Sequence, residues 1–190
     1  MRVFLTGVSC VGKTTIGKRL AELLGVKFFD LDHEIEAFFG TSIERLQAKF
    51  LTIHSYRNEA AKALVHLLNR PESRDSVIAL PPSGLMGGYL QVIKKSAGII
   101  IVLNDTPENI LERIRFFDID SKPIEKNLTP KEKHLYRKEI KKDITFFRKS
   151  YERAHLQIDI SNLNMEQAAA KVKEALERIN KEAKEQAKSE

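Results

Sequence analysis

VFLTGVSCVGKTT, residues 3–15, is the segment that is most informative about the fold. Its first four residues form a short apolar run followed at once by a glycine-rich loop, which favours a buried parallel strand over a segment of buried helix. From Lys13 onward, apolar residues recur at helical spacing, and Gly25 is placed to end the helix. The sequence therefore predicts a strand, a loop and a helix in this order.

The loop matches the eight-residue pattern whose backbone amides wrap phosphate oxygens, whose lysine reaches the β- and γ-phosphates and whose hydroxyl binds magnesium. Its glycines permit left-handed torsions and a close approach to phosphate, and the helix adds the positive end of its dipole. We therefore expect ATP and Mg²⁺ as cofactors, with Thr14 as a metal ligand. The alternative is a glycine-rich turn without a ligand. The residues expected to bind the nucleotide are Gly7, Val8, Ser9, Cys10, Val11, Gly12, Lys13, Thr14 and Thr15.

The rest of the chain alternates between strand and helix patterns. Further strands are expected at residues 26–31, 76–80, 98–103 and 157–160, and further helices at 42–68, 106–115, 131–154 and from 165 onward. The run at 98–103 is the most apolar and should be central. This alternation predicts an α/β fold with three α/β/α layers, in which a five-stranded parallel sheet is covered on both faces.

Length and composition indicate one domain over residues 1–190, with a mobile lid at about 116–130 and a frayed polar tail at about 180–190. The net charge of +6 favours anionic partners, but basic residues alternate with glutamates, so no nucleic-acid partner is expected. The single cysteine excludes an internal disulfide and fits a reducing compartment. We expect a cytoplasmic monomer without a membrane partner, since no signal peptide or membrane span is evident.

Two acids follow the second predicted strand, at the sheet edge where open α/β proteins bind ligands. Alternation along an extended segment would place Asp30 and Asp32 on the same side. One carboxylate could then hold magnesium and the other could accept a proton from an attacking hydroxyl. The alternative is a pair that caps the N-terminus of a helix.

Residues 7–46, GVSCVGKTTIGKRLAELLGVKFFDLDHEIEAFFGTSIERL, resemble the N-terminal third of a shikimate kinase. The resemblance covers the phosphate loop, the D-x-D pair and the Gly-x-Ser-Ile segment at residues 40–43. It implies a P-loop fold and transfer of the ATP γ-phosphoryl group to the 3-hydroxyl of shikimate. It assigns Asp30 to the magnesium side and makes Asp32 the residue that holds substrate hydroxyls and acts as base, while Lys13 is catalytic. It also places acceptor-binding helices at about 33–70.

The resemblance implies that two arginines grip a small hydroxy-acid substrate by its carboxylate. Arg57 lies at the position of the first, but Ala60 replaces the family's orienting glutamate and Glu59 stands one residue early. A surface ion-pairing arginine is the alternative. Arg148 corresponds to the second, although its spacing to Tyr151 is one residue shorter than in the family. The same resemblance places Arg113 against adenine.

Two segments depart from the family pattern. Residues 81–88, PPSGLMGG, replace three consecutive glycines at the substrate, so Ser83 and Gly84 become the expected contacts there, unless the segment is a plain turn. Lys122 stands in place of a catalytic lid arginine. It supplies positive charge without the planar, bidentate donors of a guanidinium group. The alternative is a solvated loop lysine. These departures leave two alternative functions open. One is a kinase for a different acceptor, such as gluconate or a nucleoside. The other is a nucleotide-binding module without turnover.

Overall fold

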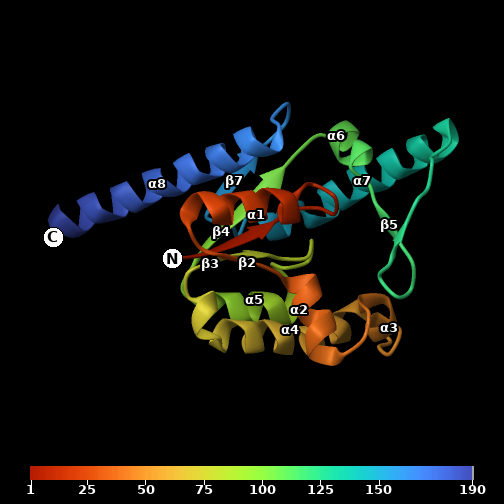
Figure 1. Ribbon diagram of the computed structural model, residues 1–190, viewed down its shortest axis with the longest axis horizontal. Helices are drawn as coiled ribbons and strands as arrows, with labels where there is room; N and C mark the ends of the chain where they lie inside the picture. Colours follow the sequence, from red (N-terminus) through yellow and green to blue (C-terminus); the bar gives the residue numbers. More distant parts are fainter. Residues whose placement is uncertain (190) are drawn as a thin grey trace.

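Five parallel strands form the central sheet, in the order β2-β3-β1-β4-β7, in a computed structural model that describes residues 1–189 (Figure 1). The strands are β1 (Arg2–Thr6), β2 (Lys27–Asp30), β3 (Ser76–Ala79), β4 (Ile99–Asn104) and β7 (Leu156–Asp159). This confirms the predicted parallel sheet. The apolar strand β4 is an inner strand between β1 and β7, whereas β1 occupies the middle.

Helices cover both faces of the sheet. The α-helices are α1 (Lys13–Leu24), α2 (Leu31–Phe39), α3 (Ile43–Gln47), α4 (Ile53–Asn69), α5 (Gly87–Lys94), α6 (Pro107–Glu112), α7 (Pro130–Tyr151) and α8 (Met165–Ser189), and a 3-10 turn, η1, covers Pro71–Ser73. Helices α1 and α8 pack together on one face, and α4 and α5 pack together on the other (Figure 1). The expected three layers are therefore present.

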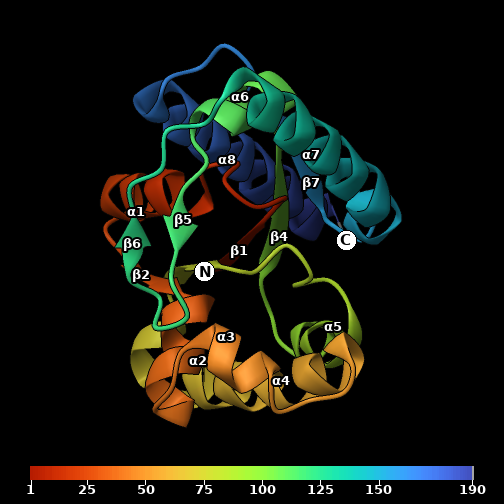
Figure 2. The same ribbon diagram turned by 90° about the vertical axis from the view of Figure 1, so that its right-hand side faces the viewer.

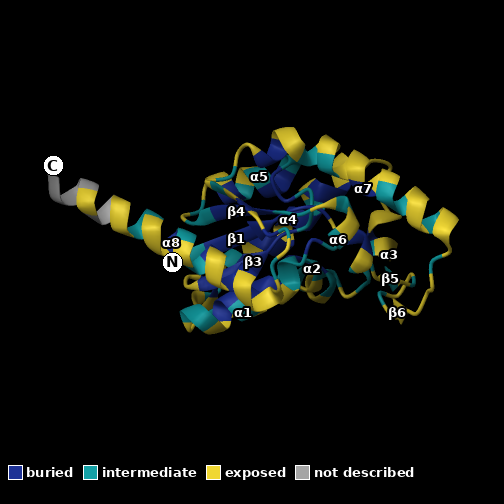
Figure 3. Cartoon of the chain, turned by 90° about the horizontal axis from the view of Figure 1, so that it is seen from above, coloured by how far each residue is buried: buried dark blue, intermediate teal, exposed yellow. Residues whose placement is uncertain are grey.

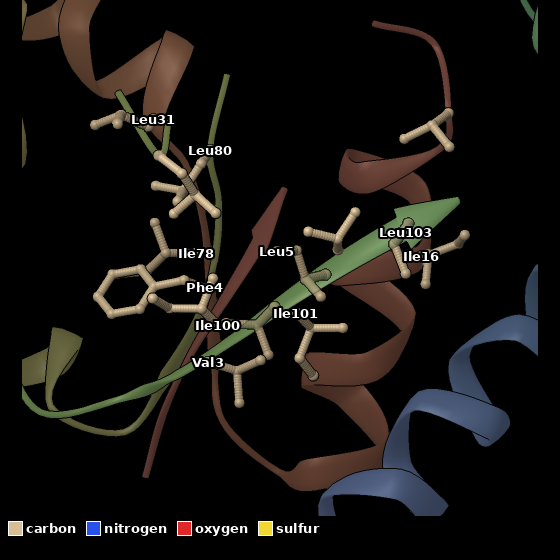
Figure 4. Close-up of a cluster of buried hydrophobic side chains, with 14 of the residues drawn as sticks. Val3, Phe4, Leu5, Ile16, Leu31, Ile78, Leu80, Ile100, Ile101 and Leu103 are labelled. Atoms are coloured by element: carbon tan, nitrogen blue, oxygen red, sulfur yellow. The ribbon is translucent and has the colours of Figure 1, made fainter. Parts of the chain in front are cut away.

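The core lies between these layers. Val3, Phe4 and Leu5 of the middle strand are fully buried, and side chains from β3 and β4 surround them (Figure 4). Exposed residues lie along the outer sides of the helices, whereas the inner strands β1, β3 and β4 are mostly buried (Figure 3). Since β1 leads directly into the phosphate loop, its burial fixes where that loop begins.

The helical pattern expected at 42–68 contains two helices, α3 and α4, because two capping residues each start a new one. Ser42 accepts a hydrogen bond from the backbone of Arg45 at the start of α3, and Thr52 accepts one from Ser55 at the start of α4. The helix expected to reach Arg115 ends earlier, at Glu112. Helix α7 begins at Pro130, behind a capping box.

Two further differences concern segments expected to be irregular. Within 116–130, β5 (Phe116–Phe117) and β6 (Pro123–Ile124) form a small antiparallel hairpin. Strands of this length leave almost no periodicity to detect. Helix α8 continues to Ser189, so the polar segment expected to be frayed is helical in its described part; Glu190 lies outside the described residues.

No helix within residues 1–189 is both long enough and apolar enough to serve as a transmembrane span.

Candidate active site

The phosphate loop packs tightly against the end of the sheet. Gly7 and Gly12 have φ of 145° and 113°, and Cys10 has φ of 60°. A Cβ atom on Gly7 would lie 2.6 Å from the carbonyl oxygen of Leu103, at the end of β4. The loop therefore requires glycine at this position for both its torsion and its space.

The remaining loop residues divide between core and surface. Val8 and Val11 are buried in the hydrophobic core, whereas Ser9 and Thr15 are exposed. The two valines anchor the loop through their side chains, so only their backbone groups are free to face a phosphate.

Lys13 folds back over the loop from the first turn of α1. Its Nζ donates hydrogen bonds to the carbonyl oxygens of Gly7, at 2.9 Å, and Val8, at 3.0 Å. Burial lowers the pKa of Lys13, while the carboxylates of Asp32 and Asp30 raise it. The ammonium group is thus held above the loop and close to both acids.

Asp30 joins the loop helix to the next helix along the chain. Its Oδ2 accepts a hydrogen bond of 2.6 Å from Thr14 Oγ1, and its Oδ1 accepts one of 3.1 Å from the backbone N–H of Asp32. Asp30 is therefore the N-cap of α2, which was the alternative interpretation of the pair. The expected extended alternation is wrong, because α2 begins at Leu31 and puts Asp32 in its first turn. The helical turn nevertheless keeps both acids beside Lys13.

The surroundings of Asp32 raise the pKa of its carboxyl group toward neutral pH. Burial is the largest cause that raises its pKa, the negative charge of Asp30 adds to the shift, and Lys13 opposes it, which leaves the pKa at about 6. A general base is most effective when its pKa lies close to the working pH. This carboxyl group could therefore take a proton from a hydroxyl group bound beside it.

The Thr14–Asp30 pair could hold a magnesium ion that arrives with a nucleotide. The described residues contain no group of three or more His, Cys, Asp or Glu side chains arranged to hold a metal by themselves. Magnesium prefers oxygen ligands and commonly takes one or two from the protein, with the rest from phosphates and water. A hydroxyl and a carboxylate 2.6 Å apart fit that requirement.

Arg57, on α4, is a buried cation without an anionic partner in the part of the chain that the structure describes. It is 9% exposed, and its Nε makes no hydrogen bond. Glu59 is instead paired with Lys62 at 2.7 Å, and Ala60 is fully buried. The alternative of a surface ion-pairing arginine is therefore wrong. Because a buried charge is costly unless it is paired, Arg57 is suited to bind an external anion.

The segment that follows β3 is a tight turn. Gly84 N–H donates to the carbonyl oxygen of Pro81 at 2.8 Å, and Met86 N–H donates to that of Ser83 at 3.0 Å. A Cβ atom on Gly84 would meet Leu80 Cβ at 2.6 Å. The turn alternative is thus present, and two backbone donors are used inside it.

This turn is fixed from both sides. Thr6 Oγ1 donates to the carbonyl oxygen of Pro81 at 3.3 Å, and Tyr151, at the end of α7, donates to that of Pro82 at 3.1 Å. Ser83 is half-buried at its centre. The side chain of Ser83 is therefore the polar group that this wall could still offer to a ligand.

The family model for shikimate kinase matches residues 9–177 of this chain. The shikimate kinase of Chlorobaculum tepidum is 33% identical over 165 residues, which cover 83% of this chain and 78% of the relative. The chain belongs to the shikimate kinase family. Shikimate kinases are ATP-dependent kinases that act on a hydroxyl group and use Mg²⁺, so this chain is an ATP-dependent kinase.

Solved structures agree with this assignment. A shikimate kinase from Aquifex aeolicus vf5 is 26% identical, with a TM-score of 0.68, and the match covers 93% of this chain and 96% of that one. A gluconokinase from Sinorhizobium meliloti 1021 is 16% identical, with a TM-score of 0.62 and coverage of 97% and 96%. The second likeness shows the shared fold alone, so architecture does not choose the acceptor.

The shikimate kinase resemblance singled out three further cations. Arg113 caps α6 and is ion-paired with the buried side chain of Asp105. Lys122 is exposed on the lid hairpin. Arg148 is exposed on α7, and its side chain has no hydrogen bond or ion pair within the described residues. The structure therefore does not join Lys122 or Arg148 to the cluster around Asp32 and Arg57.

Two features of this shikimate kinase family member were not found from its sequence. Tyr89 of α5 is buried beside Tyr56, near Arg57 and Asp32, and burial raises the pKa of both tyrosines. Its hydroxyl lies near that of Tyr56 without reaching hydrogen-bond geometry. Gly88 permits this placement, since a Cβ there would lie 2.9 Å from Asn58 Cα. The glycine pair before Tyr89 was the available signal.

The second missed feature is a cavity of about 130 Å³ between the phosphate loop, α6 and α7. Its lining is mainly apolar, and Cys10 faces it from the loop. The acids Glu139 and Asp143 lie on its α7 side, and burial followed by the charge of Glu139 raises the pKa of Asp143. Only contacts between distant segments create this cavity, so the sequence carries no pattern for it.

Proposed function

We propose that this chain acts as a cytoplasmic monomer that transfers the γ-phosphoryl group of ATP to the 3-hydroxyl of shikimate. The observation that carries the choice of acceptor is Arg57, a buried cation without a protein anion among the described residues. Its charge acts on Tyr89, as does the charge of Asp32, whose pKa is about 6. An acceptor with a carboxylate at one end and a hydroxyl at the other would satisfy both groups. Shikimate has that chemistry.

On the donor side, backbone amides of residues 7–15 would wrap the phosphates, and Lys13 would exchange its two loop carbonyls for phosphate oxygens. Thr14 and Asp30 would hold magnesium, which neutralises phosphate charge and orients the γ-phosphoryl group when it is bound. Arg113, held by Asp105, would flank the adenine. The charges of this half favour departure of ADP.

On the acceptor side, Arg57 would bind the carboxylate with two parallel N–H donors, and Arg148 would approach the same group from α7. Asp32 would orient the reacting hydroxyl, and Ser83 and Gly84 would form the wall beside it. Lys122 would add positive charge from the lid.

The transfer forms one bond and breaks another. The hydroxyl oxygen of the acceptor bonds to the γ-phosphorus, the bond from that phosphorus to the β,γ-bridging oxygen breaks, and ADP leaves with the electron pair. The hydroxyl proton passes to Asp32, which gives it to water afterwards. Positioning and charge stabilisation supply most of the rate enhancement.

A second acceptor is favoured by one observation. The turn at residues 81–86 uses two of its backbone donors internally. The resemblance to shikimate kinases implies three consecutive glycines at this position instead. A wall with fewer donors could suit an open-chain hydroxy acid such as gluconate, whose carboxylate would still meet Arg57.

A coupled assay of ADP formation with purified protein tests the choice. Shikimate, gluconate and a nucleoside are each added with ATP and Mg²⁺, and initial rates are compared with the rate without an acceptor. We expect shikimate to give the largest stimulation. Stimulation by gluconate alone would replace the first choice with the second, and a rate unaffected by any acid would refute both.

A further inference from the structure

The tip of the lid hairpin is a closed turn. Asp118 N–H donates to the carbonyl oxygen of Lys122 at 2.9 Å, and Asp118 Oδ1 accepts from the backbone N–H groups of Asp120, at 2.8 Å, and Lys122, at 2.9 Å. Ser121 has φ of 59°, in the left-handed region. One carboxylate thus sets the direction in which residues 119–121 point.

Each of those three residues contacts the corner between α2 and α3. Ser42 Oγ donates to the carbonyl oxygen of Ile119 at 2.5 Å, and Arg45 Nε donates to Asp120 Oδ1 at 2.7 Å. Ser121 Oγ donates to Glu36 Oε1. The hairpin lies against this corner in Figure 2. The partners are more than 70 residues apart in sequence, so the contacts join two separate parts of the molecule.

The corner is built by the same side chains that hold the hairpin. Glu36 Oε1 also accepts a hydrogen bond of 3.1 Å from Ile43 N–H, and Ser42 is the N-cap of α3. Glu36 lies one helical turn beyond Asp32 on α2, and its charge helps to raise the Asp32 pKa. The position of the hairpin is therefore tied to the helix that carries the proposed base.

We propose that these contacts form a latch, defined by residues 119–121 on one side and Glu36, Ser42 and Arg45 on the other, that holds the lid over the acceptor-binding segment. The residues of the latch are positioning residues, since none of them lies among the groups that would touch ATP or the acceptor. The inference rests on the proposed function in naming what the lid covers.

Within the latch, the carboxylate of Asp120 is paired with Arg45 and not with Lys122. Asp120 is bonded to Arg45, and both Arg45 and the nearby Lys122 lower its pKa, with Arg45 the larger cause. Without Arg45, the carboxylate would remain beside Lys122 and offset its charge. The latch therefore leaves Lys122 as the unpaired cation of the hairpin tip.

The strength of the latch must come from its contacts together. The two side chains of the Arg45–Asp120 pair are 51% and 47% exposed. An exposed pair of this kind shifts an equilibrium by about twofold to fivefold. A combined variant, Arg45→Ala with Ser121→Gly, removes the ion pair and the hydroxyl contact, and glycine accepts the φ of residue 121 without strain.

Hydrogen exchange on the full chain tests the latch without any substrate. Amides of residues 116–122 should exchange about threefold faster in Arg45→Ala and about tenfold faster in the combined variant, while the sheet is unchanged. Lys62→Ala is the matched control, because it removes another exposed ion pair of 2.7 Å, to Glu59 on α4. The swapped pair Arg45→Asp with Asp120→Arg should restore slow exchange.

Kinetics then connect the latch to catalysis. If only the latched state binds the acceptor productively, the combined variant should raise the acceptor KM by about tenfold and leave the KM for ATP unchanged. If the hairpin amides of the combined variant exchange no faster than those of Lys62→Ala, the latch is overturned, whichever acceptor the enzyme phosphorylates. Faster exchange in a protein that ignores shikimate supports the latch and refutes the proposed acceptor. Faster exchange with an unchanged acceptor KM limits the latch to holding the hairpin and overturns its link to the reaction.

Discussion

The two halves of this active site are built in different ways. The centre of the donor half is one continuous stretch, residues 7–15. Its shape follows from its own torsions, from the buried side chains of its two valines and from the close approach of Gly7 to Leu103. Only Asp30 and Arg113 are added to it from other segments in the proposed site. The acceptor half is assembled from α2, α4, the turn at 81–86 and the lid, which meet only in the folded chain. The two segments that depart from the family pattern, the turn and the lid, both belong to the acceptor half.

Loss of the phosphate-loop lysine in the donor half should reduce activity the most. Lys13→Ala should lower kcat by about 10³-fold, since an ammonium group aimed at developing charge typically supplies about 4 kcal/mol. The thermal midpoint should change little, because Lys13 bonds only to loop carbonyls within the described structure. Lys18→Ala, an exposed lysine of the same helix, is the control. Undiminished turnover in Lys13→Ala would remove the donor half from the mechanism.

Asp32→Asn tests whether this carboxylate accepts the proton of the acceptor hydroxyl. The value of kcat should fall by about 10²-fold or more. In the wild-type enzyme, kcat/KM should drop about tenfold per pH unit below about pH 6, because the base is then protonated. The variant should lose this limb. A wild-type profile that stays flat between pH 7 and pH 5 would contradict the role of Asp32.

The same substitution has an opposite effect on stability. Folding raises the Asp32 pKa above its ordinary value of 3.8, so the folded state binds this proton more tightly than the unfolded state. The carboxylate therefore opposes folding above about pH 6, and the opposition fades as pH falls toward 4. Asp32→Asn should raise stability at pH 7.5 by on the order of 1 kcal/mol in denaturant unfolding. A destabilised variant would mean that the carboxylate is structurally required.

Arg57→Met tests whether the acceptor half binds a carboxylate group of the substrate. The KM for shikimate should rise by about 10²-fold while the KM for ATP stays constant, because charged hydrogen bonds contribute about 1.5–3 kcal/mol each. Stability should be unchanged or higher, since a buried charge is replaced by an apolar chain of similar length. Equal effects on both KM values would indicate a general loss of structure and contradict the assignment.

The smallest expected effect is at the turn that departs from the family. Ser83→Gly should raise the acceptor KM by about threefold to tenfold, the usual effect of one neutral hydrogen bond. Thr106→Gly, which weakens the N-cap of α6 away from this wall, serves as a control for loss of a hydroxyl group. If Ser83→Gly lowers the KM instead, the serine obstructs shikimate and the wall favours another acceptor.

The sequence predicted the parts of the molecule that depend on neighbours in the chain. Strand, loop and first helix follow from apolar spacing and from glycines, and Gly25 ends α1 as expected. Asp30 and Asp32 were assigned to the site, but for the wrong geometric reason, because a cap begins α2 one residue after Asp30. Capping residues compete with extended structure, and spacing alone does not show which prevails.

What the sequence missed depends on distant contacts. Burial of Arg57 without a partner, the placement of Tyr89 beside it and the contact of Tyr151 with Pro82 arise from packing between separate elements. The two-residue strands of the lid are too short to leave a periodic pattern. The contacts between the hairpin and Ser42 join elements that no local rule connects.

Direct observation of phosphoryl transfer is the decisive measurement for this protein. Wild-type protein with ATP, Mg²⁺ and shikimate is followed by ³¹P NMR until the ATP is consumed. We predict one new phosphomonoester signal on shikimate that grows in equal amount with ADP. This signal should be lost in both Lys13→Ala and Arg57→Met at shikimate concentrations below the wild-type KM. ADP accompanied by inorganic phosphate, or ATP that persists with shikimate present, would contradict this prediction.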